Sequence, residues 1–303
     1  VVLTNQSNSD GVPSPDMLAS EGGGQIALHN LGGKGPPLLF VHATGFNGRT
    51  YGPFVERLTE HFTVWAPDLR SHGWSSSPTN GDYEWTSLAK DILCVVDYLE
   101  IDDGQLDCVG HSIGAATLLL ADAERRGLIR RMYGYEPVMW RPGEAFPAGE
   151  NPLIAGAQKR REVFGSRGEA FERFSSRPPF SSCRADALYS YVSNAFEDLE
   201  DGSVRLRCRG DEEAKVYDGE RVSTNDKIVD CEAKVLIGRG MDQGFGNLGM
   251  PAAEALANAE IIAYDDLTNF GPLEAPDRLA ADALRAVSYT HLRAHATPEH
   301  RGF

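Results

Sequence analysis

A serine between two glycines is the feature that most constrains how this chain can fold. It lies in the segment CVGHSIGAA, residues 108–116, where Gly110, Ser112 and Gly114 form the pattern G-x-S-x-G. A short apolar run typical of a strand comes before it, and IGAATLLLADAERRG, typical of a helix, comes after it. We therefore predict a tight turn from strand to helix, which holds Ser112 in strained backbone geometry with its hydroxyl exposed.

The two glycines have a steric explanation in such a turn. The helix passes close to the strand, so a side chain at Gly110 or Gly114 would clash. Ser112 would stand at the positive end of the helix, and the backbone amide of Ile113 would point to where an oxyanion forms. A glycine-rich turn with an incidental serine also fits this segment, but it leaves the loop VHATGFNG, residues 41–48, unexplained.

Short apolar runs, each too short for a helix, recur along the chain and predict buried strands. Helical spacing of apolar residues in TSLAKDILCVVDYLE, residues 86–100, predicts a helix between the second and third of these runs. Strand, helix and strand in this order indicate a parallel sheet with right-handed crossovers. The predicted strands are residues 36–43, 62–69, 106–112, 130–138, 233–240 and 259–267.

The pattern changes from about Trp140 to Asp230. No buried strand is evident there, and amphipathic spacing predicts helices such as ADALYSYVSNAFEDL, residues 185–199, while 175–182 and 200–213 are typical of loops. Because the strands resume afterwards, we expect a mainly helical cap over one edge of the sheet. The expected division is a core of 17–139 and 231–286 with a cap of 140–230.

Both ends of the chain are expected to lie outside this fold. Residues 1–16 are polar and predict a loose arm. The segment VSYTHLRAHAT, residues 287–297, resembles a translated sequencing adapter. We therefore interpret 287–303 as a non-native tail and exclude its histidines as site candidates.

Composition excludes several classes of protein. The net charge of −15 and the lack of a long basic stripe argue against nucleic acid and membrane surfaces as partners. No apolar run is long enough to span a bilayer and no secretory signal is evident, which predicts a cytoplasmic protein. The five cysteines are scattered and form no CxxC pair, which favours packed thiols over a disulfide framework or a zinc site.

Four motifs in this order carry a family resemblance: VHATGF, APDLRSHGWSS, VGHSIG and NFGPLEAP. Together they resemble the α/β-hydrolase superfamily with a helical cap, over residues 24–286. The resemblance implies an α/β fold with a mostly parallel eight-stranded sheet flanked by helices, and a Ser, acid, His triad in chain order. It also implies acyl transfer from a small-molecule acyl substrate to water, and we expect no cofactor. The sequence does not indicate an oligomeric state.

Within such a fold, Ser112 is the predicted nucleophile. Relatives that act on haloalkanes or epoxides carry aspartate at this position, so serine indicates esters, thioesters, lactones or amides instead. The backbone amides of Ile113 and Thr44 are the predicted oxyanion hole. We expect His42 to be a structural side chain that bonds its loop, and Asp68, Arg70 and His72 of APDLRSHGWSS to shape the sheet edge without taking part in chemistry.

Two carboxylates compete for the acid position. Asp242 follows the predicted strand 233–240, where most family members place the acid, and is preferred. Glu136 ends the predicted strand 130–138, a position that some relatives use. Structural roles are also open for both, an Asx turn for Asp242 and bonding of neighbouring amides for Glu136.

The base position holds an asparagine, Asn269, where the family has a histidine before FGPLEAP. A carboxamide can form a hydrogen bond to Ser112 but has no useful basicity. Loss of the triad histidine costs on the order of a millionfold in turnover. Three hypotheses follow: a sequence error or chance lesion, a pseudoenzyme that binds an acyl ligand, or rescue by another base such as His111 or His42, which we disfavour because His111 should point away from the hydroxyl.

The sequence thus predicts a serine hydrolase of ester-type bonds that works through an acyl-enzyme and is impaired by Asn269. The alternative is a non-catalytic ligand-binding protein, and a third class is a structural protein with no pocket beneath its cap. Aromatic residues of the cap either line an acyl pocket or pack the cap itself. These residues are Trp140, Phe146, Phe171, Phe174, Phe180, Tyr189 and Tyr191.

Overall fold

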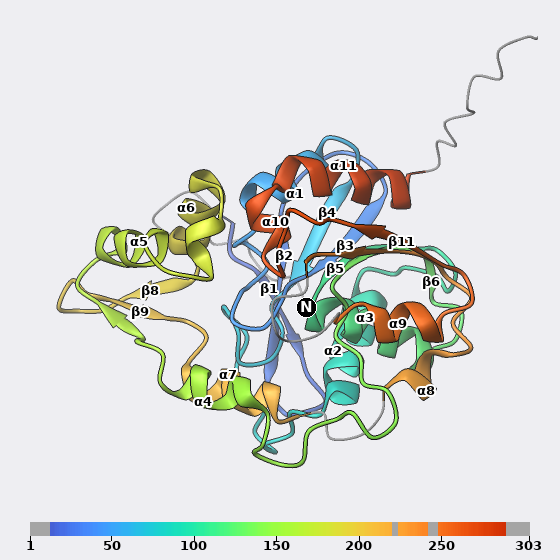
Figure 1. Cartoon of the computed structure of the whole chain (residues 1–303), viewed down its shortest axis with the longest axis horizontal. Coiled ribbons are helices and arrows are strands. Elements are labelled where there is room, and N and C mark those ends of the chain that lie inside the picture. The colour runs from blue at the N-terminus through green and yellow to red at the C-terminus, as the bar shows by residue number, and fades with distance from the viewer. Residues whose placement is uncertain (1–12, 220–223, 242–247, 289–303) are drawn as a thin grey trace, which may run out of the picture.

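The core of the protein is one twisted sheet of eight strands, in the order β1-β2-β4-β3-β5-β6-β10-β11. A computed structural model describes residues 13–219, 224–241 and 248–288 (Figure 1). From β4 to β11 across the sheet all neighbours are parallel, whereas β2 is antiparallel to both β1 and β4. The strands are β1 Asp16–Ala19, β2 Gln25–Asn30, β3 Pro37–Val41, β4 Thr63–Pro67, β5 Leu106–His111, β6 Ile129–Tyr135, β10 Lys234–Arg239 and β11 Ala259–Ala263. The predicted fold class is confirmed.

Helices cover both faces of this sheet, as a parallel sheet requires. Along β3, Leu39 and Val41 face one core and Leu38 and Phe40 face the other. The first core packs under α2 Trp85–Tyr98, α3 Ile113–Glu124 and α9 Met250–Ala255, and the second under α1 Gly52–Thr59 and α11 Pro276–Val287 (Figure 1). Each fully buried Leu, Val or Phe contributes about 1.5–3 kcal/mol, so these two layers supply most of the stability.

The segment between β6 and β10 contains more than helices. A small antiparallel sheet, in the order β7-β9-β8, lies among its helices. Figure 1 shows α5, α6, β8 and β9 as a lobe beside the main sheet. Its elements are α4 Pro152–Gln158, β7 Val163–Phe164, α5 Arg167–Ser175, η1 Phe180–Ser182, α6 Ala185–Asn194, β8 Phe196–Asp198, β9 Val204–Leu206, α7 Gly210–Tyr217 and α8 Asn225–Ile228.

No buried strand was evident in this segment from the sequence, but the structure has three short, partly buried strands among its described residues. The helix predicted over 185–199 ends at Asn194, and Phe196 begins a strand instead. The loop predicted over 200–213 contains β9 and the first turn of α7. These strands have only two or three residues, too few for an alternating pattern to be distinguished from helical spacing.

Helix α7 joins this segment to the core through Glu212. One oxygen of its carboxylate accepts hydrogen bonds from the hydroxyls of Ser71 at 2.8 Å and Ser77 at 3.1 Å, and from Tyr83. Ser71 has a φ of 63°, a conformation that favours glycine. The hydroxyl that bonds Glu212 is thus carried by a residue in this unusual conformation. The hydroxyls of Ser71 and Tyr83 lie 3.0 Å apart.

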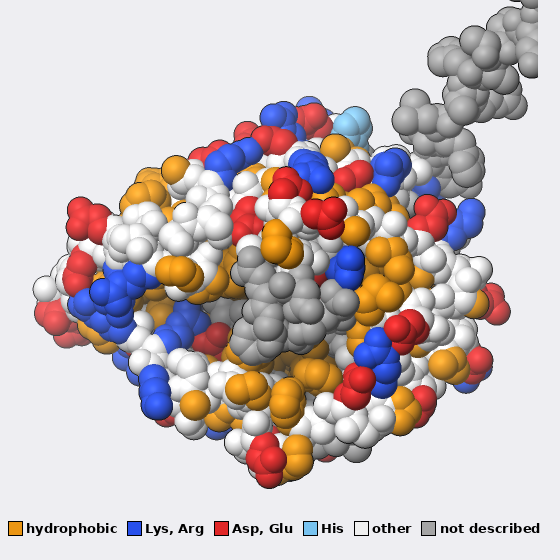
Figure 2. All heavy atoms as spheres, in the orientation of Figure 1, with side chains coloured by type: hydrophobic (Ala, Val, Ile, Leu, Met, Phe, Trp, Pro, Cys, Tyr) orange, Lys and Arg blue, Asp and Glu red, His pale blue; other side chains and the backbone are white. Residues whose placement is uncertain are grey.

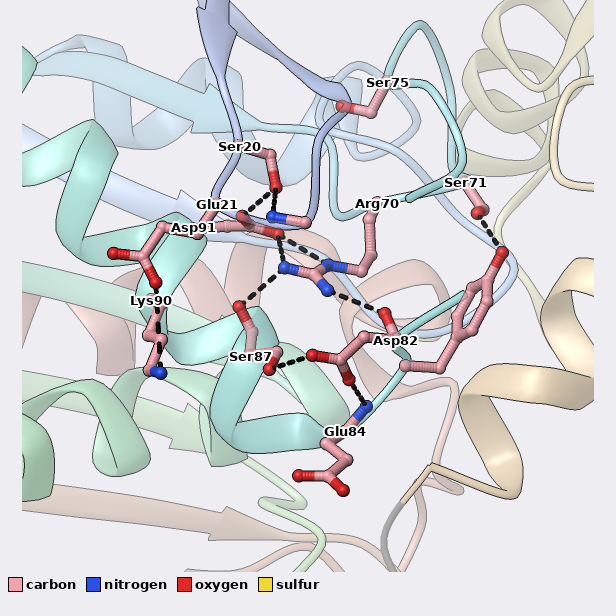
Figure 3. Close-up of polar contacts among 12 residues, drawn as sticks. Ser20, Glu21, Arg70, Ser71, Ser75, Asp82, Glu84, Ser87, Lys90 and Asp91 are labelled. Carbon is pink, nitrogen blue, oxygen red and sulfur yellow. Dashed lines mark hydrogen bonds and ion pairs between the residues drawn. The ribbon is translucent and has the colours of Figure 1, made fainter. Parts of the chain in front are cut away.

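A buried ion pair between Arg70 and Asp91 connects the sheet edge to α2 (Figure 3). The Arg70 guanidinium also donates to the carbonyls of Asp82 at 2.7 Å and Ser87 at 2.8 Å. Ser20, beyond the end of β1, donates to the second oxygen of Asp91 at 2.6 Å. Both charged side chains are 1–2% exposed, so the pair depends on this full set of hydrogen bonds. Arg70 therefore has the structural role that the sequence predicted.

On the face in Figure 2, acidic and basic side chains are interspersed around the rim, and pairs such as Arg141 with Glu254 are exposed. Among the described residues, no helix has the length and apolar character to cross a membrane. The five cysteines are free thiols. Strand β1 begins at Asp16, so the end of the predicted arm belongs to the sheet, and 289–303 of the predicted tail lie outside the described residues.

Candidate active site

The turn from β5 to α3 places Ser112 at the carboxyl edge of the sheet. Its backbone angles are φ 53° and ψ −121°, a strained conformation for any residue with a side chain. A Cβ at Gly110 would lie 2.5 Å from the Cα of Ala115, and one at Gly114 would lie 2.3 Å from the carbonyl oxygen of Val41. Both glycines are therefore required by close approach of the helix, for the reason that the sequence suggested.

Removal of the Ser112 side chain should relieve this strain. We expect Ser112→Gly to be more stable than Ser112→Ala by about 1–2 kcal/mol, because alanine keeps the Cβ that the conformation disfavours. The measurement is the free energy of unfolding in urea for the two variants. Equal stabilities would contradict a strained turn.

Two backbone amides beside Ser112 are available to a ligand. Ala43 donates its amide to the hydroxyl of Tyr51 at 3.1 Å, and Gly45 donates to Nε2 of His72 at 3.0 Å. The amide of Thr44 between them has no hydrogen-bond partner among the described residues. Ile113 is the first residue of α3, where an amide has no acceptor within the helix. These are the two amides predicted to form the oxyanion hole.

His42 has both ring nitrogens engaged by the main chain. Nδ1 donates to the carbonyl of Ala43 at 2.8 Å, and Nε2 accepts from the amide of Leu69 at 2.9 Å. Burial lowers the pKa of His42 to about 3, so the ring is neutral and fully bonded. This arrangement gives His42 the structural role that the sequence favoured and leaves it no nitrogen for a serine proton.

Buried neutral histidines should make the protein sensitive to acid. The pKa values of His42 and His111, lowered by burial to about 3 and about 4, lie below that of an unfolded histidine, near 6.5. Their stabilising contribution is therefore complete above about pH 6.5 and is lost as pH falls, by about 1.4 kcal/mol per pH unit for each histidine, because the unfolded chain binds protons first.

The measurement is urea unfolding at several pH values between 7 and 4.5. His42→Gln keeps one acceptor and one donor but cannot titrate. Its free energy of unfolding should therefore change less steeply with pH, by the contribution of one titrating histidine. His61 is exposed, and His61→Gln should leave the wild-type slope unchanged. A wild-type slope in His42→Gln would contradict a buried neutral ring.

The loop after β11 brings residue 269 beside the turn that carries Ser112. The carbonyl of Asn269 accepts a hydrogen bond from Nε2 of His111 at 2.8 Å, and the carbonyl of Thr268 accepts one from the hydroxyl of Tyr135 at 2.6 Å. Nδ2 of Asn269 is buried and has no hydrogen-bond partner among the described residues. An orphaned amide group of this kind costs about 1–3 kcal/mol, and the described residues do not satisfy this one.

Glu136 follows β6 with a φ of 48° and has both carboxylate oxygens bound to backbone amides. Oε1 accepts from Gly240 at 2.6 Å and Oε2 accepts from Gly249 at 3.0 Å. Glu136 therefore fixes both ends of the connection between β10 and α9, which is the structural role weighed for it above. Asp242, the other candidate acid, lies outside the described residues.

An aromatic wall lies beside residue 269. The ring of Phe46 lies 5.0 Å from Tyr191, 6.2 Å from Phe180 and 5.9 Å from Phe270, between centroids. The aromatic residues predicted for the cap therefore fall into two groups. Phe180 and Tyr191 reach this wall, whereas Trp140 and Phe146 pack on each other at 5.5 Å and Tyr189 is 68% exposed.

Sequence reasoning missed Tyr51 and Tyr135. Each hydroxyl bonds a loop of the site, but the partners are distant in sequence, so no local pattern points to them. Within 13–219, 224–241 and 248–288, no group of His, Cys, Asp and Glu is arranged to hold a metal ion.

Comparisons with known proteins show the family and the fold. The 2-(acetamidomethylene)succinate hydrolase of Mesorhizobium japonicum is 29% identical over 208 residues, which are 69% of this chain and 71% of that protein. The N-formylmaleamate deformylase of Pseudomonas putida is 33% identical over 126 residues, 41% of this chain and 46% of the other. A solved structure of E-2-(acetamidomethylene)succinate hydrolase superposes with a TM-score of 0.74 at 20% identity, over 90% of this chain and 98% of that one. Residues 38–283 match the sequence model of the alpha/beta hydrolase family.

Proposed function

Because this chain belongs to the alpha/beta hydrolase family, we propose that it descends from serine hydrolases that cleave ester, thioester or lactone bonds of small molecules through an acyl-enzyme. The observation that carries the proposal is the strained turn at Ser112, which is followed directly by the first amide of α3; the amide of Thr44 has no partner among the described residues and supports it. A nucleophile next to two convergent amides is the arrangement that acyl transfer requires.

Each group then has a chemical role. Oγ of Ser112 attacks the carbonyl carbon of the substrate, and the amides of Thr44 and Ile113 bind the oxyanion of the tetrahedral intermediate. The intermediate collapses with release of the alcohol or thiol, and water hydrolyses the ester left on Ser112. A base at position 269 would take the serine proton and return it to the leaving group. Asn269 cannot do so, which impairs turnover in this chain.

For the acid of the triad we propose Asp242. What supports this choice is that Glu136 already uses one oxygen for Gly240 and the other for Gly249. These two bonds account for Glu136 as a residue that fixes a loop, and Asp242 follows β10, where most family members place the acid. Glu136 then acts through the position of the β10–α9 connection.

The two carboxylates should respond differently to neutralisation. In an Asn269→His background, Asp242→Asn should lower kcat by roughly 10⁴-fold, because the acid orients the histidine and stabilises its charged form. Glu136→Gln should instead lower the free energy of unfolding by about 1–3 kcal/mol, because its NH₂ group would face a backbone N–H. The measurements are steady-state kinetics and urea unfolding of both variants. The opposite pattern would assign the acid to Glu136.

The names of two relatives widen the substrate class to test. One hydrolyses an acetamido compound and the other is a deformylase of an N-formyl compound, so amides belong beside esters in a substrate panel. A second candidate function, a ligand-binding protein that has lost turnover, is favoured by one observation, the asparagine at the base position.

The proposal is tested by covalent labelling. A fluorophosphonate probe should form an adduct on Ser112 in the Asn269→His variant, located by mass spectrometry of the peptides. The same probe should leave Asn269→His with Ser112→Ala unlabelled at this peptide. An adduct on a different residue, or none in Asn269→His, would contradict a nucleophilic Ser112.

A further inference from the structure

His111 connects two loops of the candidate site through its two ring nitrogens. Nδ1 lies 2.8 Å from the hydroxyl of Tyr51, and Nε2 lies 2.8 Å from the carbonyl oxygen of Asn269. The same Tyr51 oxygen lies 3.1 Å from the amide of Ala43. His111 and Tyr51 are 2% and 1% exposed, so the protein itself must satisfy these groups.

The groups of Asn269, His111, Tyr51 and Ala43 form a series of hydrogen bonds. Only one direction of donation along this series satisfies every atom. The carbonyl of Asn269 can only accept, so Nε2 of His111 must carry the proton. Nδ1 of a neutral ring is then an acceptor, and the hydroxyl of Tyr51 must donate to it. The oxygen of Tyr51 remains free to accept, and the amide of Ala43 donates to it.

We infer that His111 and Tyr51 are positioning residues. They hold the oxyanion loop, which carries Thr44, and the base loop, which carries Asn269, in fixed positions relative to each other. This inference rests on the proposed function. Ala43 and Asn269 are the two ends of the series: the first precedes the oxyanion amide of Thr44, and the second carries the base position. On the far side of Thr44, the amide of Gly45 is fixed by His72. The series thus determines where two catalytic groups stand relative to Ser112, which directly follows His111.

A neutral His111 is necessary for this arrangement, because a proton on Nδ1 would oppose the hydroxyl proton of Tyr51. Burial lowers the pKa of His111 to about 4, against the raising effect of its hydrogen bonds to the main chain and side chain of Asn269. The ring is therefore neutral across the ordinary range of assay pH.

The tautomer of His111 can be measured in the chain as it stands. A long-range ¹H–¹⁵N spectrum of protein labelled with ¹⁵N-histidine, assigned by comparison with His111→Gln, should show a neutral ring protonated on Nε2 between pH 7 and pH 5.5. A ring protonated on Nδ1, or a charged ring at pH 7, would overturn the inferred series whatever the activity of the protein.

The catalytic consequence is tested in the Asn269→His background. Tyr51→Phe removes the central hydroxyl, and we expect kcat for a p-nitrophenyl ester to fall roughly 10- to 100-fold, because small misplacements of reacting groups are costly, with KM changed less than about threefold. Tyr133→Phe is the matched control: it removes another buried hydroxyl, bonded to Tyr264 at 3.1 Å, and should leave kcat unchanged.

The outcomes separate the two proposals. Equal kcat values for Tyr51→Phe and Tyr133→Phe would overturn the positioning role, even with the expected tautomer. An inactive Asn269→His variant would overturn the proposed function and the catalytic role together, while the tautomer measurement still accepts or rejects the hydrogen-bond series by itself.

Discussion

Asn269→His should turn a nearly inert chain into an esterase, with kcat for short p-nitrophenyl esters rising by about a thousandfold to a millionfold. The reason is that a base is the one group that the proposed site lacks. The carbonyl of residue 269 is bonded to His111, the residue before Ser112, so a side chain at 269 starts beside the nucleophile. Imidazole has a pKa near 6.5 and can accept the serine proton, which a carboxamide cannot.

The measurement is the steady-state rate of the wild type, Asn269→His, and Asn269→His with Ser112→Ala. The double variant is the matched control, because it keeps the new histidine and removes only the hydroxyl. If the rate of Asn269→His does not exceed that of the double variant, the pocket has lost more than its base. The ligand-binding function would then be the better account of this chain.

A second large effect is expected at the buried pair of Arg70 and Asp91 in Figure 3. Asp91→Ala should lower the free energy of unfolding by about 3–5 kcal/mol, because it leaves the guanidinium of Arg70, 1% exposed, without its counter-ion. Replacement of both partners, Arg70→Met with Asp91→Leu, should be less harmful than the single change, since it removes the uncompensated charge.

Urea unfolding of these variants checks both statements. The control is Glu254→Ala, which breaks an ion pair with Arg141 whose side chains are 36% and 49% exposed. Such an exposed pair contributes about 1 kcal/mol or less, so this variant should remain close to the wild type. A loss of similar size in Asp91→Ala and Glu254→Ala would show that burial does not govern the contribution of these pairs.

The parts of the fold that could be predicted are those that local sequence specifies. All six predicted runs are strands of the main sheet, because buried parallel strands read as short apolar runs bounded by glycine, proline or aspartate. Strands β1 and β2 were not recognised, because β1 is a four-residue edge strand and β2 has only three consecutive apolar residues between polar ones. The small strands between β6 and β10 were missed because each has only two or three residues.

The candidate site also has parts that the local sequence specifies and parts that it does not. The turn at Ser112 is specified by five consecutive residues, and the structure has it where the sequence placed it. The hydrogen bonds of Tyr51 to His111 and of Glu136 to Gly240 join residues 60 and 104 positions apart, and single-sequence patterns contain no information on such pairs. For this reason the sequence could identify two candidate acids but could not decide between them. The assignment of Asp242 as the acid remains a prediction.

The carboxylate of Glu136 also has a consequence for how this protein can change during evolution. It binds the amides of both Gly240 and Gly249, so the two ends of the connection between β10 and α9 lie close together. The entropy needed to close a loop grows only with the logarithm of its length, about 0.6 kcal/mol for each doubling. Insertions between these two glycines therefore cost the main sheet little stability.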